Sequence, residues 1–194
     1  EINEKDPVKF VEIVKSLEPT FGGINLEDIK APECFYIEKR LKAEMNIPVM
    51  HDDQHRTAII SAAALLNACE IQKKKLDKVR IIVSGAGAAA ISCIKLYIAL
   101  GAKKENFRVF DSKGLIHESR TDLDDQKREF ACSGKNNSLE EEMKNADVFI
   151  GLSKGGVLNA NMIKSMAKNP IVFAMANPDP EITYEEATGA RKDV

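Results

Sequence analysis

The sequence predicts an α/β protein in which a mostly helical segment precedes a doubly wound parallel sheet. Three observations carry this prediction. From residue 79 onward, short apolar runs alternate with helical patterns, as in successive βαβ units. A glycine-rich turn follows the first of these runs and opens a helix. Before residue 78, most apolar residues recur at helical spacing.

Residues 1–77 form the predicted helical segment. Val11, Val14 and Leu17 belong to an apolar stripe that stops before Pro19, where a helix is expected to end. The other elements expected here are an extended or turning segment over 20–28, a helix over 32–45, a short strand over 47–50 and a long helix over 56–74.

Residues 78–194 form the predicted sheet domain, and the boundary is expected near 75–78. The expected strands cover 79–84, 107–110, 147–150 and 171–175. The expected helices cover 88–100 and 162–168, with one or two more between 123 and 145. Strands that alternate with helices favour a parallel sheet.

The turn after the first strand has the GxGxxA form of a dinucleotide-binding fingerprint. Its residues are Gly85, Ala86, Gly87, Ala88, Ala89 and Ala90. Gly85 permits the tight turn, Gly87 lets the backbone approach a pyrophosphate, and Ala90 is small enough for close helix–sheet packing. The free N–H groups of the helix N-terminus also attract phosphate. A Rossmann-type domain is therefore expected, and the alternative is a tight turn without a ligand.

An acid near the end of the second strand bears on the choice between NAD and NADP. Asp111 would accept hydrogen bonds from the adenosine ribose, which favours NAD. Ser112 and Lys113 follow it, and both could contact a 2′-phosphate. Asp111 could also cap a loop. The sequence leaves the choice of cofactor open.

Two acidic pairs, Glu27-Asp28 and Asp52-Asp53, each follow an extended segment. Either pair could cap a helix. Beside a dinucleotide domain, clustered carboxylates favour Mg²⁺ or Mn²⁺, because hard cations prefer oxygen ligands. His51 and His55 are four residues apart, but the pattern lacks the glutamate of an HExxH metal site, so a histidine metal site is disfavoured.

Composition excludes several other classes of protein. The net charge of −2 gives no bulk attraction to nucleic acid or to an anionic membrane. Neither a membrane-spanning run nor a signal peptide is evident in the sequence. The four cysteines include no CxxC pair, which favours a reducing compartment, and we expect a cytoplasmic protein. Both ends of the chain look like cuts in a longer polypeptide.

Several blocks in order give the sequence a resemblance to one family. They are Phe21–Asp28, Ile47–His55, Gly85–Ala89, Asp111–Gly114, Asp147–Gly151 and Ala176–Glu181. Together they resemble malic enzymes, in particular the compact bacterial and archaeal type. The resemblance covers essentially the whole chain, and ordered blocks are more specific than any one motif.

The resemblance implies a fragment of an oxidoreductase that converts L-malate to pyruvate and CO₂ with NAD or NADP and Mg²⁺ or Mn²⁺. It implies that Glu27, Asp28 and Asp53 are the metal ligands. Asp52 would be the acidic partner of a catalytic lysine, and Asn177 would lie beside the nicotinamide and the substrate.

The family's proton-transferring Tyr and Lys belong to a segment before Glu1, so we expect these 194 residues alone to be inactive. The full-length protein is expected to be a homo-oligomer without nucleic-acid or membrane partners. An alternative is a nucleotide-binding or oligomerisation module without catalysis of its own. A metal-free dehydrogenase, such as an amino-acid dehydrogenase, is disfavoured by the two acidic pairs.

Three residues depart from the family's pattern. Arg56 replaces a glycine and could pair with Asp52 or another carboxylate, or could fill the substrate pocket. Ala90 replaces a glycine, which the fingerprint tolerates. Asp179 replaces a threonine and adds negative charge, which would not help to bind malate.

Overall fold

A computed structural model describes residues 1–30 and 32–194 as two compact units, Glu1–Thr57 and Ala58–Val194. The division falls inside helix α3 (Asp52–Ile71), earlier than the boundary expected near 75–78. The physical reason is packing. From Ala58 onward, the buried residues of α3, including Leu65, belong to the hydrophobic core of the second unit.

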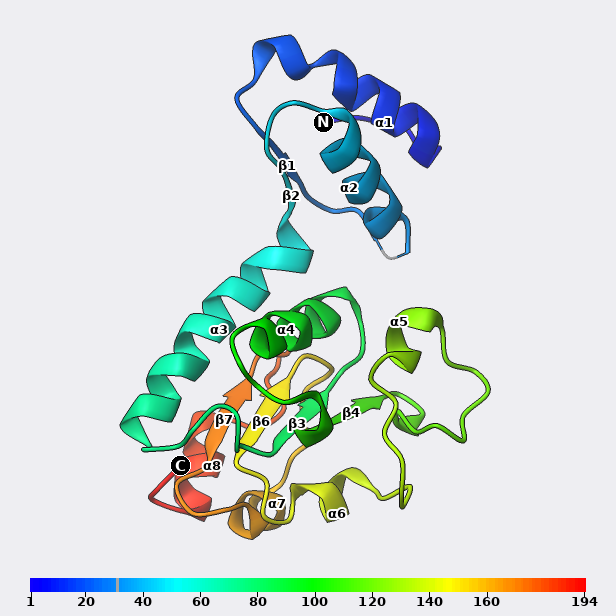
Figure 1. The fold of residues 1–194 in the computed structure, drawn as a ribbon. Helices are drawn as coiled ribbons and strands as arrows, with labels where there is room; N and C mark the ends of the chain where they lie inside the picture. The colour runs from blue at the N-terminus through cyan, green and yellow to red at the C-terminus, as the bar shows by residue number, and fades with distance from the viewer. Residues whose placement is uncertain (31) are drawn as a thin grey trace. The chain divides into compact units, whose positions relative to one another are not determined.

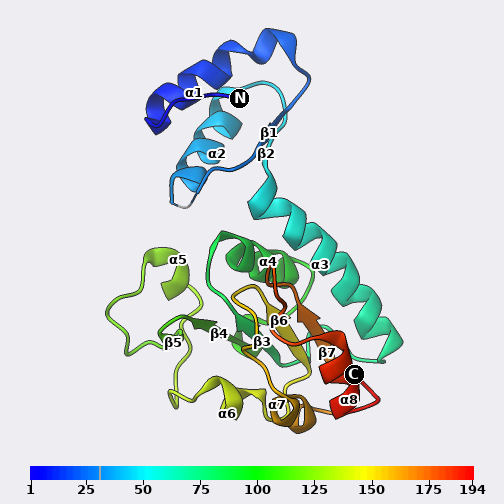
Figure 2. The same ribbon diagram turned by 180° about the vertical axis from the view of Figure 1, so that it is seen from behind.

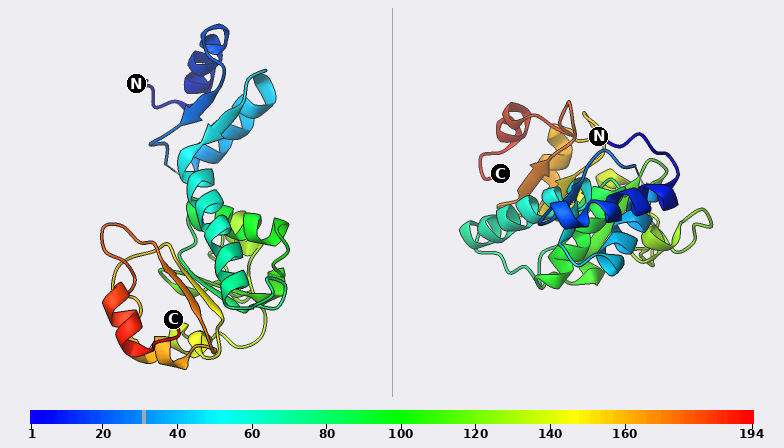
Figure 3. Two further views of the ribbon diagram at one scale, coloured as in Figure 1. Left: turned by 90° about the vertical axis from the view of Figure 1, so that its left-hand side faces the viewer. Right: turned by 90° about the horizontal axis from the view of Figure 1, so that it is seen from above.

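The first unit combines two helices with a short pair of strands. Its elements are α1 (Pro7–Ser16), the 3₁₀ helix η1 (Glu18–Thr20), β1 (Ile24–Leu26), α2 (Glu33–Glu44), β2 (Val49–His51) and the first turns of α3. The strands β1 and β2 are parallel and lie side by side (Figure 3, left). The pairing itself was not predicted, because the sequence between 20 and 28 shows only an extended segment.

The core of the first unit confirms the helical stripe of α1. Val11 and Val14 are buried together with Leu41 of α2 and with Leu26 and Val49 of the two strands. Helix α1 begins after Asp6, whose carboxylate accepts hydrogen bonds from the first backbone N–H groups of the helix. The packing of both helices on one strand pair positions the loop that follows β1 and the start of α3, which follows β2 directly.

The second unit contains the predicted parallel sheet. Its strands are β3 (Ile81–Ser84), β4 (Phe107–Asp111), β5 (Gly114–Leu115), β6 (Val148–Gly151) and β7 (Ile171–Ala174). Their order is β5-β4-β3-β6-β7, which Figure 2 shows from one edge of the sheet to the other. All neighbours are parallel except β5, a two-residue strand antiparallel to β4 that the sequence did not predict.

Helices cover both faces of this sheet (Figure 1). The remaining helices of the unit are α4 (Ala88–Ala99), η2 (Lys104–Asn106), α5 (Asp125–Arg128), α6 (Leu139–Met143), α7 (Ala160–Ser165) and α8 (Tyr184–Ala190). Alternate residues of β3 show the two layers. Ile81 and Val83 pack in the core with α3 and α4, whereas Ile82 packs in the core with α6, α7 and α8. The doubly wound Rossmann-type fold is thus confirmed.

The direction of the chain reverses at β3. From β3 the chain moves outward to β4, and it then returns to the other side of β3 to form β6. In open α/β sheets, ligands bind outside the carboxyl ends of the strands at such a switch point. The fold therefore directs attention to the loops after β3 and β6.

Two further findings concern the described parts of the chain. The cysteines are free thiols, three of them buried. Within residues 1–30 and 32–194, no helix is both long and apolar enough to cross a membrane.

Candidate functional site

The glycine-rich turn lies at the switch point of the sheet. Gly85 has a φ of +118°, a conformation that L-residues rarely adopt. Its N–H donates to the carbonyl of Phe110 at 2.8 Å. A Cβ added at Gly85 would overlap the carbonyl oxygen of Leu152, which follows β6. Gly85 is therefore required by the protein's own backbone.

Gly87 differs from Gly85, because nothing in the protein demands a glycine there. It is the N-cap of α4 with a φ of −85°, and no described heavy atom lies within 4 Å of an added Cβ. No side chain caps this helix, so its first N–H groups are open to a ligand. Ala90 is buried in the core below the turn. These features are the geometry expected of a pyrophosphate cradle.

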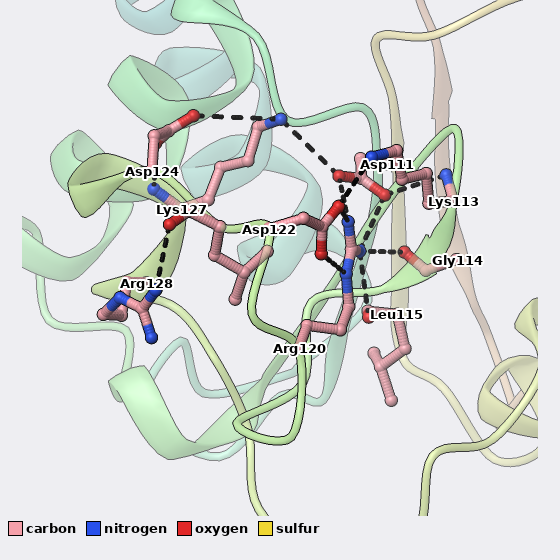
Figure 4. A network of polar contacts seen from close by, with 10 residues as sticks. Asp111, Lys113, Gly114, Leu115, Arg120, Asp122, Asp124, Lys127 and Arg128 are labelled. Atoms are coloured by element: carbon pink, nitrogen blue, oxygen red, sulfur yellow. Dashed lines mark hydrogen bonds and ion pairs between the residues drawn. The ribbon is translucent and has the colours of Figure 1, made fainter.

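Asp111, the predicted ribose acceptor, is already engaged in a network of polar contacts (Figure 4). The two terminal nitrogens of Arg120 donate to its two oxygens at 2.8 and 2.9 Å. The N–H of Lys113 donates to Oδ1 at 2.9 Å, and Nζ of Lys127 lies 3.5 Å from Oδ2. Burial acts to raise the pKa of Asp111, but the hydrogen bonds from Arg120 and Lys113 outweigh it and lower the pKa.

The charges around the end of β4 are paired rather than uniformly positive. Lys113 reaches Asp122 at 2.8 Å, and Arg120 also contacts Asp122 at 2.9 Å. Lys127 lies 3.9 Å from Asp124 (Figure 4). The sequence did not predict the role of Arg120, because this residue lies beyond β5 in a loop without a recognisable pattern. Only the fold brings it to Asp111.

The acidic pairs of the first unit follow its two parallel strands. Leu26 is opposite His51 in the register of β1 and β2, so Glu27-Asp28 and Asp52-Asp53 leave the same end of this pair. Asp28 has a φ of +55°, an uncommon conformation that aspartate tolerates better than most residues. Glu27, Asp28 and Asp53 are exposed, whereas Asp52 is buried.

Arg56 pairs with Asp52, one of the alternatives considered from the sequence. Its Nη2 lies 2.7 Å from Oδ2 of Asp52, one turn earlier in α3. The guanidinium is otherwise largely exposed to solvent, so the pair joins a buried acid to a surface cation. The buried carboxylate of Asp52 thus has a cationic partner within the first unit.

The predicted metal ligands fit Mg²⁺ or Mn²⁺ by their chemistry. Three carboxylates that leave one end of a parallel strand pair supply the oxygen donors that these ions prefer. Their side chains do not converge, since the described residues contain no group of three or more His, Cys, Asp or Glu able to hold a metal ion. The ligand assignment of Glu27, Asp28 and Asp53 stays a prediction.

The two histidines of the first unit have protein partners. His51 is buried, accepts the N–H of Gln54 on Nδ1 at 3.3 Å, and directs Nε2 at the carbonyl of Ile29 at 3.2 Å. His55 contacts the carboxylate of Glu38 at 2.6 Å. Both imidazoles are therefore engaged by protein groups.

Glu38 is a buried residue that sequence reasoning missed. Besides His55, its carboxylate contacts Lys42 at 2.7 Å and accepts the N–H of His51 at 3.2 Å. Burial acts to raise the pKa of Glu38, but hydrogen bonds from Lys42 and His55 lower it below its usual value. Its position inside a helical stretch of mixed charges gave no signal of this role.

Asn177 lies two residues after Met175, in the loop that follows β7. It is exposed, and its peptide bond to Pro178 is cis. The preceding Ala176 donates its N–H to Oε2 of Glu181 at 3.1 Å. The loop thus presents Asn177 at the same edge of the sheet as the glycine-rich turn, and its role near a cofactor stays a prediction.

Comparison with known proteins identifies the family. The family model described as the malic enzyme NAD-binding domain matches residues 55–191, and that of the malic enzyme N-terminal domain matches residues 2–42. The chain belongs to the malic enzyme family. It is 55% identical to an NADP-dependent malic enzyme of Haemophilus influenzae and 50% identical to an NAD-dependent malic enzyme of Rhizobium meliloti. All of this chain is covered, but only 26% and 25% of those relatives.

Solved malic enzyme structures share the fold. The NAD-dependent malic enzyme of Thermotoga maritima matches with a TM-score of 0.90 and 45% identity, over 97% of this chain and 51% of that one. The malic enzyme of Pyrococcus horikoshii matches with a TM-score of 0.88 and 40% identity, over 97% and 46%. The chain thus spans about half of these solved malic enzymes and about a quarter of the two curated relatives. The resemblance seen in the sequence is confirmed.

Proposed function

We propose that the full-length protein containing this chain oxidises and decarboxylates L-malate to pyruvate and CO₂, with NAD(P) and a divalent metal. The observation that carries the proposal is the open cradle at Gly87, at the switch point of a Rossmann-type sheet in a malic enzyme chain. A hydride leaves C2 of malate for the nicotinamide and the hydroxyl loses its proton, which gives a β-keto acid. Loss of CO₂ from this acid leaves an enolate, which takes a proton at C3 to give pyruvate.

In this proposal the second unit holds the cofactor. The N–H groups at the start of α4 bind its pyrophosphate, with Gly85, Ala86, Gly87, Ala88, Ala89 and Ala90 around it. Asn177, exposed after β7, lies beside the nicotinamide and the substrate. The support for these roles is the placement of both loops at the carboxyl edge of the sheet.

Glu27, Asp28 and Asp53 would hold Mg²⁺ or Mn²⁺. When bound, the metal would supply Lewis-acid chemistry, polarising the oxygen on C2 of the substrate. Asp52 would be the acidic partner of a lysine, and its burial suits such a role because a nearby cation stabilises a buried carboxylate. In this chain Arg56 forms an ion pair with that carboxylate, with Nη2 2.7 Å from Oδ2 of Asp52.

We further infer that NADP is accepted as well as NAD. The carboxylate of Asp111 would repel a 2′-phosphate if it were unpaired, but the two-pronged contact with Arg120 compensates its charge. Lys113 and Lys127 lie at the same strand end, where each is paired with an aspartate. Relatives of both preferences are known among the similar sequences, which include NADP- and NAD-dependent malic enzymes.

One observation favours the alternative of a nucleotide-binding module without catalysis. The ion pair between Arg56 and Asp52 engages the acid proposed to act with the lysine. Three properties stay predictions from the sequence: a cytoplasmic location, a homo-oligomeric state, and the lack of nucleic-acid or membrane partners.

The deciding experiment uses the full-length protein with L-malate, Mn²⁺ and either NADP or NAD. Formation of the reduced cofactor together with pyruvate and CO₂ is expected, and the ratio of kcat/KM for NADP and NAD gives the cofactor preference. Calorimetry measures cofactor binding in parallel. Tight cofactor binding without any oxidation of malate would instead support the module that lacks catalysis.

A further inference from the structure

Glu181 is a buried carboxylate without a role in the steps described so far. It is 0% exposed, and both of its oxygens accept hydrogen bonds from neutral donors. Oε1 accepts the backbone N–H of Ser153 at 2.9 Å and its hydroxyl at 3.2 Å. Oε2 accepts the backbone N–H of Ala176 at 3.1 Å. Among the described residues, none forms an ion pair with Glu181.

These contacts join the loops after β6 and β7 at the carboxyl edge of the sheet and, through Ser153, reach the end of β3. Ser153 follows β6, and Ala176 follows β7. The hydroxyl of Ser153 also lies 2.9 Å from that of Ser84, the last residue of β3. Gly85 comes directly after Ser84, and Asn177 directly after Ala176. One side chain therefore ties together the strand ends that carry both predicted halves of the cofactor site.

The space for this carboxylate is provided by Gly151 at the end of β6. A Cβ at Gly151 would overlap the carboxylate group of Glu181. Burial of a charge without an ion pair is costly, so a carboxylate is a poor way merely to fill space. The carboxylate instead provides two fixed acceptors. Each accepts a backbone N–H that does not take part in the sheet, one in the loop after β6 and one in the loop after β7.

We propose that Glu181 is a positioning residue for the cofactor site, which holds the loop after β7 so that Asn177 meets the nicotinamide end of the dinucleotide. The inference rests on the proposed function. Glu181 does not touch the reacting atoms, since it lies fully buried below the loops. It acts through Ala176, which it anchors to the loop after β6.

The conservative variant Glu181→Gln tests the acceptor geometry. An amide has one acceptor oxygen and one donor nitrogen, so its NH₂ group would face a backbone N–H on one side or the other. One anchor is then lost while the side-chain volume is kept. Glu185→Gln removes the same charge from an exposed position of α8 and serves as the matched control.

The experiment compares NADP with 2′-phospho-ADP-ribose, which lacks the nicotinamide, on the full-length wild type and both variants. In Glu181→Gln we expect unchanged affinity for the nicotinamide-free ligand and weaker binding of NADP. We expect kcat to fall about a hundredfold, the loss that a misplacement of about an ångström can cause. Glu185→Gln should match the wild type in every measurement.

Several results would overturn the inference. One is an unchanged kcat in Glu181→Gln; another is an equal loss of affinity for both ligands, the sign of a purely structural role. If Glu181→Gln does not fold, Ser153→Ala removes the hydroxyl donor to Oε1 and the contact with Ser84 but keeps both backbone donors, and a smaller fall in kcat with unchanged binding of the nicotinamide-free ligand is expected. An unchanged kcat in Ser153→Ala then overturns the inference. Absence of malate oxidation in the wild type contradicts the proposed function instead, and the binding comparison still judges Glu181.

Discussion

Replacement of Gly87 by valine should reduce cofactor binding without disturbing the fold. The backbone at Gly87 is extended, with φ −85° and ψ −175°, which valine adopts readily. No described heavy atom lies within 4 Å of the new Cβ, so the side chain enters open space. The protein should therefore fold normally, while the branched side chain occupies the approach of the pyrophosphate.

The expected loss of affinity follows from the hydrogen bonds at stake. A hydrogen bond to a charged group contributes about 1.5–3 kcal/mol, and loss of one at the start of α4 would weaken cofactor binding about 10- to 100-fold. The stability cost is smaller, because an apolar residue at an N-cap costs about 1 kcal/mol relative to a good capping residue. Binding should thus change far more than stability.

Calorimetric titration of NADP into the wild type and Gly87→Val measures the first effect, and urea unfolding measures the second. Gly189→Ala is the control, since Gly189 is also exposed with no described atom near an added Cβ. It lies in α8, away from the turn, and should bind NADP as the wild type does. Equal affinity in Gly87→Val would refute the reasoning and leave the turn without a ligand.

Three further predictions concern other residues. Glu38→Gln should destabilise the protein at neutral pH and flatten the acid dependence of its free energy of unfolding in urea. The pKa of Glu38 is lower in the folded protein than its unfolded value of about 4.5, so the ionised carboxylate stabilises the fold above that pH. This stabilisation is lost as the pH falls through the folded pKa. Asp53→Asn should weaken Mn²⁺ binding about tenfold or more by paramagnetic resonance. Arg56→Gly should change the affinity for Mn²⁺ less, because Arg56 is held in an ion pair with Asp52. Equal changes in Mn²⁺ affinity in the two variants would contradict the assignment of Asp53 as a ligand. Gly151→Ala should cost about 1–3 kcal/mol in unfolding experiments, because its methyl group overlaps Glu181.

The sequence predicted those parts of the fold that local patterns encode. The parallel strands at Ile81–Ser84 and Phe107–Asp111, and the helix Ala88–Ala99 between them, match the expected ranges within two residues. Their signals are local: an apolar run, a glycine-rich turn and a helical stripe follow each other directly along the chain. The glycine-rich turn could be recognised for the same reason.

The sequence did not predict the contacts that join distant segments. Lys74 follows α3, and its Nζ contacts Asp147 at 2.6 Å and the carbonyl of Lys168 at 2.9 Å, two partners far from it in the sequence. The contact of Arg120 with Asp111 and the burial of Glu181 belong to the same class. A charged side chain has the same appearance in a sequence whether it is solvated or paired, because its partner is chosen by the tertiary fold.

The pairing of Asp111 with Arg120 alters how far the field of that acid extends. An isolated charge acts over a distance limited mainly by salt, whereas two opposite charges held 2.8 Å apart form a dipole whose potential decays more steeply. A strand-end aspartate is then a poor indicator of the nucleotide that its neighbourhood accepts. In chains of this kind, the loop beyond the short hairpin determines whether an incoming phosphate meets a charge or a nearly neutral surface.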